Sequence, residues 1–374
     1  MLRFFLLLLP VMAFSQSLPS QLEAILNQQF KPNEPGVAVL VMDGGKVVFR
    51  KGFGLAYVQK PMTITPKTTF RMASVSKQFT AMAILLLEKQ GKLRLSDALS
   101  TFFPELPAWS RNINLQQMLT HTSGIVDGEG LLTEENGNIL AENAAVKRQL
   151  QADYQGIRQI ADKDHLLLLQ KVGTTYFQPG TQFRYSNSAY CLLALIVEKV
   201  SGLSYARFLD KFVFKPLGMK NARVFSPPSI IPQRSFGYAQ NQAGRWFFND
   251  QSQTSATVGD GGVYLSIDDY AIWYKALLNN ALIDIILVHK TLFSMAGDKH
   301  KYGAGWFFDD QVMFHSGTTC GFSNFVVAIP ASGKVIAWFS NRANDHAAFG
   351  EIQRILVEQG FLKQEVWKWH EQTQ

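Results

Sequence analysis

Strand-like segments lie near both ends of the chain, and a long stretch without them separates the two groups. Near the N-terminus, residues 36–42 and 46–56 are rich in Val and Phe and flank Asp43-Gly44-Gly45, which favours a hairpin turn. In the C-terminal third, short apolar runs separated by turn residues cover residues 302–308, 311–314, 322–329 and 335–340. This distribution predicts one antiparallel sheet built from both ends of the chain.

Helical patterns occupy the region between the two groups of strands. A buried helix is expected over residues 79–90, where apolar positions are nearly continuous up to a stop at Gly91. Four further helical stretches alternate with proline-containing loops, at residues 115–119, 164–171, 188–200 and 205–214. A short amphipathic helix is expected at the capping box Ser20–Glu23, and another helix is expected over residues 347–359.

The predicted fold class is therefore α/β (α+β), an antiparallel sheet flanked by helices with an inserted, mainly helical lobe. The α/β lobe comprises residues 16–91 plus 256–374, and the inserted lobe comprises residues 92–255. Of the 374 residues, 47% are hydrophobic and 17% charged, which excludes a disordered chain, a collagen and a coiled coil. The positive charges behind the net charge of +7 are scattered along the sequence, so we expect no nucleic-acid partner. A protein that works beside an anionic surface fits this charge better.

Residues 1–15 have the pattern of a cleavable signal peptide. Arg3 precedes the apolar run of residues 4–14, and the small residues Ala13 and Ser15 mark a cleavage site near Ser15. The run is shorter than the roughly 20 residues that span a bilayer, and no later apolar segment approaches that length. We therefore expect a periplasmic or secreted protein with no stable membrane span after cleavage; a retained anchor is the alternative.

The sequence offers little support for a metal, a cofactor or a disulfide framework. Cys191 lies in an apolar run and is expected in the core, whereas Cys320 lies in a Gly-rich stretch, where a reactive thiol is the alternative to an inert one. No H-E-x-x-H or C-x-x-C pattern, Walker loop or dinucleotide fingerprint is present, so we expect neither metal nor cofactor. The absence of G-x-S-x-G argues against an α/β-hydrolase esterase.

Ser74 and Lys77 are three positions apart at the start of the predicted buried helix. This spacing puts the hydroxyl and the amine one turn apart on the same face, so they can touch. A serine nucleophile needs a base, and burial and the helix dipole both favour the neutral amine that can serve as one. The alternative is that Ser74 caps the helix and Lys77 is solvated, and the S-x-x-K spacing alone does not decide between them.

Two further segments carry polar groups at the edges of predicted elements. Tyr185-Ser186-Asn187 lies on a loop before a helix, where the phenol and the amide can assist proton transfer and hold Lys77 or a substrate carbonyl. The alternative is a packed Tyr185 ring, with Asn187 or Ser188 capping the helix. His315-Ser316-Gly317-Thr318 ends a predicted strand, where a glycine lets backbone approach a ligand and a backbone N–H can stabilise an oxyanion.

Together these three segments resemble the serine β-lactamase and penicillin-recognising enzyme family. The order of the motifs matches the branch that holds class C β-lactamases, D,D-carboxypeptidases, D-aminopeptidases and related esterases. The resemblance covers roughly residues 33 to 342. Flanking segments that also look like the family are His121-Thr122-Ser123-Gly124, Pro216-Leu217-Gly218-Met219, Gly261-Gly262-Val263 and Tyr302-Gly303-Ala304-Gly305-Trp306.

The resemblance implies a two-lobed, β-lactamase/transpeptidase-like fold with the active site between the lobes. It implies that Ser74 is the nucleophile and that Lys77 and Tyr185 share the acid–base work, while Asn187 positions Lys77 and the acyl amide. The backbone N–H groups of Ser74 and Thr318 would then form the oxyanion hole beside Gly317. His121, outside the catalytic trio, is expected to be structural.

One departure from the family pattern concerns the substrate. Class C β-lactamases carry Lys at the position of His315, and a histidine is mostly neutral at pH 7, so anion binding should be weaker. Arg342, after the final strand, is either a carboxylate contact or a structural residue.

We therefore expect an exported serine hydrolase that acts through an acyl-enzyme on amide or ester bonds. D,D-carboxypeptidase or D-amino-acid peptidase activity on peptidoglycan-derived peptides is the leading interpretation. An esterase or a weak β-lactamase of the same fold is the alternative, and a non-catalytic penicillin-recognising binding or sensor domain is an alternative of another class. The expected partners are small peptide, ester or β-lactam-like substrates, and the oligomeric state stays open.

Overall fold

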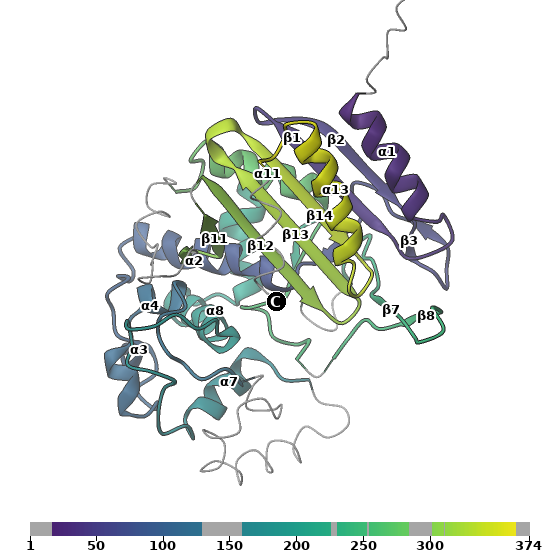
Figure 1. The fold of residues 1–374 in the computed structure, drawn as a ribbon. Helices are drawn as coiled ribbons and strands as arrows, with labels where there is room; N and C mark the ends of the chain where they lie inside the picture. The colour runs from purple at the N-terminus through teal and green to yellow at the C-terminus, as the bar shows by residue number, and fades with distance from the viewer. Residues whose placement is uncertain are drawn as a thin grey trace, which may run out of the picture.

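The computed structural model describes residues 17–128, 159–225, 230–252, 254–283, 301–309 and 311–363 (Figure 1). The predicted signal peptide, residues 1–15, lies outside the described residues.

A seven-stranded antiparallel sheet forms the centre of the molecule, with strand order β10-β11-β12-β13-β14-β1-β2. Its N-terminal strands are β1 (Val37–Asp43) and β2 (Lys46–Phe53). Its C-terminal strands are β10 (Lys301–Gly303), β11 (Trp306–Asp309), β12 (Val312–Thr319), β13 (Phe322–Ile329) and β14 (Lys334–Ser340). The first strand pairs with the last, from Val37 opposite Ser340 to Met42 opposite Val335. The prediction of one antiparallel sheet from both chain ends is confirmed.

Three strand predictions differ from the structure in detail. Residues 302–308 form two strands, β10 and β11, because Ala304 and Gly305 both have positive φ and turn the chain back. The predicted strand at 46–56 breaks at Gly54, which has φ 75°, into β2 and β3 (Leu55–Tyr57). The strand predicted over residues 311–314 continues as β12 to Thr319, because it stays paired with β13 over that length.

Helices cover both faces of the sheet (Figure 1). On one face, α1 (Leu18–Gln29) and α13 (His346–Glu358) pack against alternate residues of β1, including Val37 and Val39. On the other face, α11 (Ile267–Leu278) packs against β1, and α2 (Lys77–Lys89) belongs to the same hydrophobic core as Leu40 and Met42. Because both faces are covered, β1 is apolar from Val37 to Met42 instead of alternating with polar residues.

Residues 92–255 are mainly helical where the structure describes them. The described helices in this range are α3 (Leu99–Phe102), η2 (Ala108–Asn112), α4 (Leu115–Leu119), α7 (Asp162–Leu169), α8 (Asn187–Ser201), α9 (Tyr205–Leu209), the π-helical η4 (Asp210–Phe214) and α10 (Lys215–Leu217). This range also contains the short strands β6 (Arg223–Val224), β7 (Tyr238–Gln240) and β8 (Trp246–Phe248). The predicted helix over 205–214 is therefore an α-helix that continues into a π-helical turn.

A three-stranded sheet joins these parts. Strand β9 (Val263–Leu265) lies between β5 (Phe70–Arg71) and β6, so the segment before the nucleophile pairs with the segment before α11. Strand β3 pairs with β4 (Met62–Thr63).

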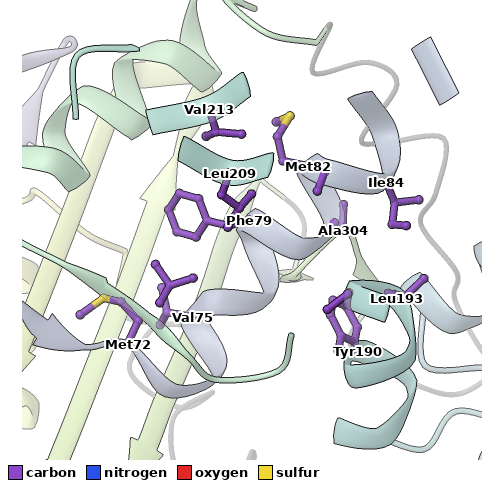
Figure 2. Close-up of a cluster of buried hydrophobic side chains, with 14 of the residues drawn as sticks. Met72, Val75, Phe79, Met82, Ile84, Tyr190, Leu193, Leu209, Val213 and Ala304 are labelled. Atoms are coloured by element: carbon purple, nitrogen blue, oxygen red, sulfur yellow. The ribbon is translucent and has the colours of Figure 1, made fainter. Parts of the chain in front are cut away.

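The helix α2 is the centre of the larger hydrophobic core. Figure 2 draws its Phe79 and Met82 together with Leu209 and Val213 from the inserted region. The Phe79 ring also contacts Trp273 of α11, with 4.5 Å between ring centroids. Packing from several elements fixes the position of the N-terminus of α2, where Ser74 and Lys77 lie.

No single helix among the described residues is long and apolar enough to cross a membrane, although one bent pair, Asn187–Ser201 with Tyr205–Leu217, passes that test by length and composition.

Candidate active site

Ser74 lies in a short 3-10 turn, η1 (Ala73–Ser76), between β5 and α2. Ala73 has φ 46°, in the left-handed region that residues other than glycine rarely adopt. Strained backbone of this kind persists only where the surrounding structure holds it, and it is frequent at active sites. The turn leaves Ser74 partly exposed at the start of α2, whereas Val75 and Ser76 are buried.

The amine of Lys77, the first residue of α2, is fully buried and lies 3.1 Å from Oγ of Ser74. It also donates to Oδ1 of Asn187 at 2.7 Å and to the backbone carbonyl oxygen of Asp260 at 3.0 Å. Both of these oxygens can only accept, so together they take two protons of the amine. A neutral Lys77 would then direct its lone pair to the Ser74 hydroxyl, which is the arrangement that a general base requires.

Neighbouring groups set the charge of this lysine. Burial lowers the pKa of Lys77, but Tyr185 and the carboxylate of Asp260 outweigh burial and raise the pKa above its ordinary value. Burial also raises the pKa of Tyr185, against the opposing effects of Lys77 and Ser74. The resting site at neutral pH therefore holds an ammonium group and a phenol. A base forms when this coupled pair loses a proton.

The ring of Tyr185 lies beside the Lys77 amine, with 4.8 Å between Nζ and the ring centroid. Its hydroxyl is buried close to Lys77 and Ser74 but makes no hydrogen bond of normal geometry within the described part of the chain. The ring packs against His121, with 4.2 Å between centroids. Tyr185 is thus a packed residue, as one interpretation of the sequence had it, and its hydroxyl also faces the nucleophile.

Neighbouring residues position the loop from which the side chain of Asn187 reaches α2. Ser186, not Asn187 or Ser188, caps α8, because its Oγ accepts from the backbone N–H of Ala189 at 3.2 Å. The backbone N–H of Ser186 donates to Nδ1 of His121 at 3.1 Å. Both contacts fix the loop from which Asn187 reaches Lys77, and His121 has the structural contact expected of it.

His315 is buried in β12 and is held at both ring nitrogens. Nδ1 lies 2.6 Å from the carbonyl oxygen of Ser316, and Nε2 lies 3.1 Å from the hydroxyl of Tyr302. Because a carbonyl only accepts, Nδ1 carries the proton and Nε2 accepts from Tyr302. Burial, with a smaller contribution from Lys77, lowers the pKa of His315 to about 3, so the ring is neutral across the physiological range. It supplies no positive charge at the position where class C enzymes have Lys.

Gly317 lets β12 lie directly against η1. A Cβ atom at this position would lie 2.2 Å from the carbonyl oxygen of Met72 and 3.2 Å from the backbone nitrogen of Ser74. The side chain of Asn324 strengthens the contact by donating to the carbonyl oxygens of Arg71, at 2.8 Å, and Gly317, at 3.2 Å. Thr318 follows Gly317 and is exposed. The geometry brings this part of β12 next to the backbone N–H of Ser74.

The structure thus brings Ser74, Lys77, Tyr185 and Asn187 into one site, next to the segment of β12 that contains His315, Gly317 and Thr318. Sequence reasoning did not include Asp260, whose carbonyl is an acceptor for Lys77. The signal was available, because Gly261-Gly262-Val263 was noted as family-like without a role and Asp260 is the preceding residue.

The remaining candidates lie elsewhere or have other partners. Arg342 is buried, donates to the carbonyl oxygen of Pro35 at 2.7 Å and lies 3.6 Å from a carboxylate oxygen of Glu34, so its contacts are structural. Both cysteines are free: Cys191 is buried, as expected, and Cys320 is partly exposed.

Comparison with known proteins places this geometry in context. The family model described as Beta-lactamase matches residues 22–359. Penicillin-binding protein 4* of Bacillus subtilis (strain 168) is 27% identical over 327 residues, which cover 82% of this chain and 68% of that protein. Protein flp of Staphylococcus aureus (strain MW2) is 29% identical over 345 residues, which cover 87% of this chain and 64% of that protein. The chain spans about two thirds of the length of these relatives.

Two solved structures share the fold. A penicillin binding protein from Bacillus halodurans has a TM-score of 0.73 at 24% identity, covering 91% of this chain and 100% of that chain. An octameric penicillin-binding protein homologue from Pyrococcus abyssi has a TM-score of 0.72 at 22% identity, covering 92% and 77% respectively. The family match over nearly the whole described chain, joined to the arrangement of the motifs at one site, leads to one conclusion: this chain belongs to the Beta-lactamase family.

Proposed function

We propose that the protein is an exported serine hydrolase that forms an acyl-enzyme on Ser74. The observation that carries this proposal is the set of three acceptors around the Lys77 amine, in which Asn187 and Asp260 occupy two positions and Ser74 the third. A non-catalytic binding domain would have no need for a buried amine held against a partly exposed hydroxyl.

The proposed reaction begins when the Lys77–Tyr185 pair has lost one proton. The pair takes the proton of the Ser74 hydroxyl as Oγ bonds to the substrate carbonyl carbon, and the backbone N–H groups of Ser74 and Thr318 stabilise the oxyanion. The same pair then gives a proton to the departing amine or alcohol. Water, activated in the same way, releases the acid and restores the Ser74 hydroxyl.

We propose peptidoglycan-derived peptides with D-amino acids as the substrate class. Relatives named as penicillin-binding proteins support this class, and the neutral, buried His315 argues against efficient β-lactam hydrolysis. The signal-peptide pattern of residues 1–15 supports a periplasmic or secreted location. We further propose that the site lies between an α/β lobe (16–91 plus 256–374) and the inserted lobe (92–255), since Tyr185 and Asn187 come from the insertion.

A substrate panel tests the proposal. We expect D-Ala-D-Ala peptides or D-aminoacyl amides to be hydrolysed by the wild type and not by Ser74→Ala, while benzylpenicillin forms a long-lived adduct. Rapid penicillin turnover without an adduct would indicate a β-lactamase instead. Hydrolysis of p-nitrophenyl acetate alone would indicate an esterase. Equal activity in the wild type and Ser74→Ala on every substrate would refute the serine mechanism.

A further inference from the structure

Asp162, the first residue of α7, has a buried carboxylate that the proposed mechanism does not use. The carboxylate accepts hydrogen bonds from two consecutive backbone N–H groups. The nitrogen of Val258 lies 3.2 Å from each of its oxygens, and the nitrogen of Gly259 lies 3.3 Å from Oδ1. Asp162 therefore fixes the backbone of Val258 and Gly259, the two residues that precede Asp260.

The same segment is held tightly by α2 and α8. The hydroxyl of Thr80, on α2, donates to the carbonyl oxygen of Gly259 at 2.5 Å. A Cβ atom on Gly259 would lie 2.4 Å from the carbonyl oxygen of Tyr190, on α8, so this position requires glycine. One residue further on, the carbonyl oxygen of Asp260 receives a hydrogen bond from Lys77 at 3.0 Å. Three helices thus determine where this carbonyl lies.

We propose that Asp162 is a positioning residue of the active site, which in its ionised form holds Val258 and Gly259 so that the Asp260 carbonyl stays on the Lys77 amine. Binding of a proton on Oδ2 of Asp162 removes the negative charge that attracts both backbone N–H groups and leaves Val258 to share Oδ1 with Gly259, so both hydrogen bonds weaken. The segment then loosens, and Lys77 loses one of the two acceptors that direct its lone pair to Ser74. This inference rests on the proposed role of Lys77 as base.

The surroundings place this protonation in the neutral range. Burial and, to a lesser extent, Asp260 raise the pKa of Asp162 to about 7, against the Cys191 thiol and the two backbone N–H groups. Burial raises the pKa values of Cys191 and Tyr205, which therefore stay neutral. Among the described residues, the other titratable groups that interact with Asp260 are Lys77 on α2, Asp127, His165 on α7 and Tyr185.

A divalent cation is the rival explanation for this cluster. The donor atoms of Asp162, Cys191 and Asp260 all lie within 4.8 Å of one another. However, the hydrogen bonds from Val258 and Gly259 account for the buried carboxylate of Asp162 without a cation. The experiment below separates the two explanations.

The test is the pH dependence of kcat and KM for p-nitrophenyl acetate from about pH 5 to about pH 10. For the wild type, log kcat should rise with a slope near one above about pH 7 and fall more steeply below it, because two groups must then lose a proton. Asp162→Asn should lower kcat at about pH 8 by about tenfold to a hundredfold and should keep KM within about twofold of the wild-type value. Its pH profile should lack the change of slope near pH 7, here called the break.

Asp164→Asn is the matched control. Asp164 is buried in the same first turn of α7, but its carboxylate accepts from the backbone N–H of Ala161 at 2.8 Å. We expect this variant to lose thermal stability and to keep the break. A wild-type profile without the break, or a break that survives in Asp162→Asn, overturns the proposal even if the variant is poorly folded.

Two further outcomes have separate meanings. A wild-type rate that falls with EDTA and returns with Zn²⁺, but is insensitive to both in Asp162→Asn, would assign the cluster to a cation and overturn the positioning role. Equal ester turnover by Ser74→Ala and the wild type would instead overturn the proposed function itself. This outcome differs from a failure of the positioning role, because it concerns the nucleophile and not the pH profile.

Discussion

At the scale of single residues, the chemistry depends on where one proton lies. Lys77 is buried, which favours a neutral amine, yet Tyr185 and Asp260 shift the balance towards the ammonium. Each pH unit below the pKa lowers the fraction of neutral amine about tenfold, so at neutral pH most Lys77 is protonated and cannot act as a base. The side chains of the site are therefore in place at neutral pH, but the reaction requires the loss of one proton from the Lys77–Tyr185 pair.

The first prediction concerns the pH dependence of acylation. Because the pKa values of Lys77 and Tyr185 are both raised, the rate of Ser74 acylation should rise continuously towards alkaline pH. The measurement is the rate of labelling by a neutral fluorophosphonate, whose own charge does not change with pH. A rate that is flat from about pH 5 to about pH 9 would contradict the assignment of the base to this pair.

The second prediction concerns His315. With its pKa lowered to about 3, His315 should remain neutral down to mildly acidic pH and should carry its proton on Nδ1. Nitrogen-15 NMR of the histidine rings, with His315→Gln to assign the signal, measures both properties directly. A His315 ring that becomes protonated near its ordinary pKa of about 6.5 would contradict the described contacts with Tyr302 and Ser316.

At the scale of elements, the site depends on the contact of β12 with η1. Gly317→Ala would place a methyl group 2.2 Å from the carbonyl oxygen of Met72, which forces the strand and the nucleophile turn apart. We expect a loss of about 1–3 kcal/mol in the free energy of unfolding and a larger loss in acylation rate.

Gly173→Ala is the control for this substitution, because a Cβ atom at Gly173 would have no heavy atom within 4 Å. Chemical denaturation and labelling kinetics should leave this variant close to the wild type. If Gly317→Ala behaves like the control, the close approach of β12 to Ser74 is not what holds the site together.

Some elements of the structure could be predicted from the sequence and others could not. The hairpin, the C-terminal strands and the buried helix follow from apolar periodicity and turn residues, and Ser74, Lys77, Tyr185 and Asn187 follow from motif order. The extension of β12 through Thr319 could not be predicted, because polar residues such as Ser316 do not give the apolar pattern of a strand. This part of β12 is held in the sheet by its pairing with β13, which the local sequence does not reveal. Asp260 was missed because it meets Lys77 only through the folding of distant segments, and Asp162 was missed because it contacts Val258 and Gly259, which are also far from it in the sequence.

At the scale of the whole molecule, the fold is closed by contacts between the ends of the chain and its middle. Asn341, after β14, accepts from the backbone N–H of Gly36 at 2.7 Å and donates to the carbonyl oxygens of Leu55, at 3.0 Å, and Phe236, at 2.9 Å. This one buried amide therefore joins three segments that are far apart in the sequence.

The corresponding prediction is that Asn341→Ala leaves several buried backbone groups without partners and lowers the free energy of unfolding by about 3 kcal/mol or more. Thermal unfolding measures this against Asn279→Ala, an exposed residue after α11. Similar melting temperatures for the two variants would show that closure of the sheet does not depend on Asn341.

The central claim is that Ser74 is the nucleophile of an acyl-enzyme, and intact-mass analysis with benzylpenicillin tests it most directly. We expect the wild type to gain the mass of one penicilloyl group, located by peptide mapping on the segment that contains Ser74, and Ser74→Ala to gain none. An adduct that forms equally on Ser74→Ala, or that maps to another residue such as Cys320, would contradict the account.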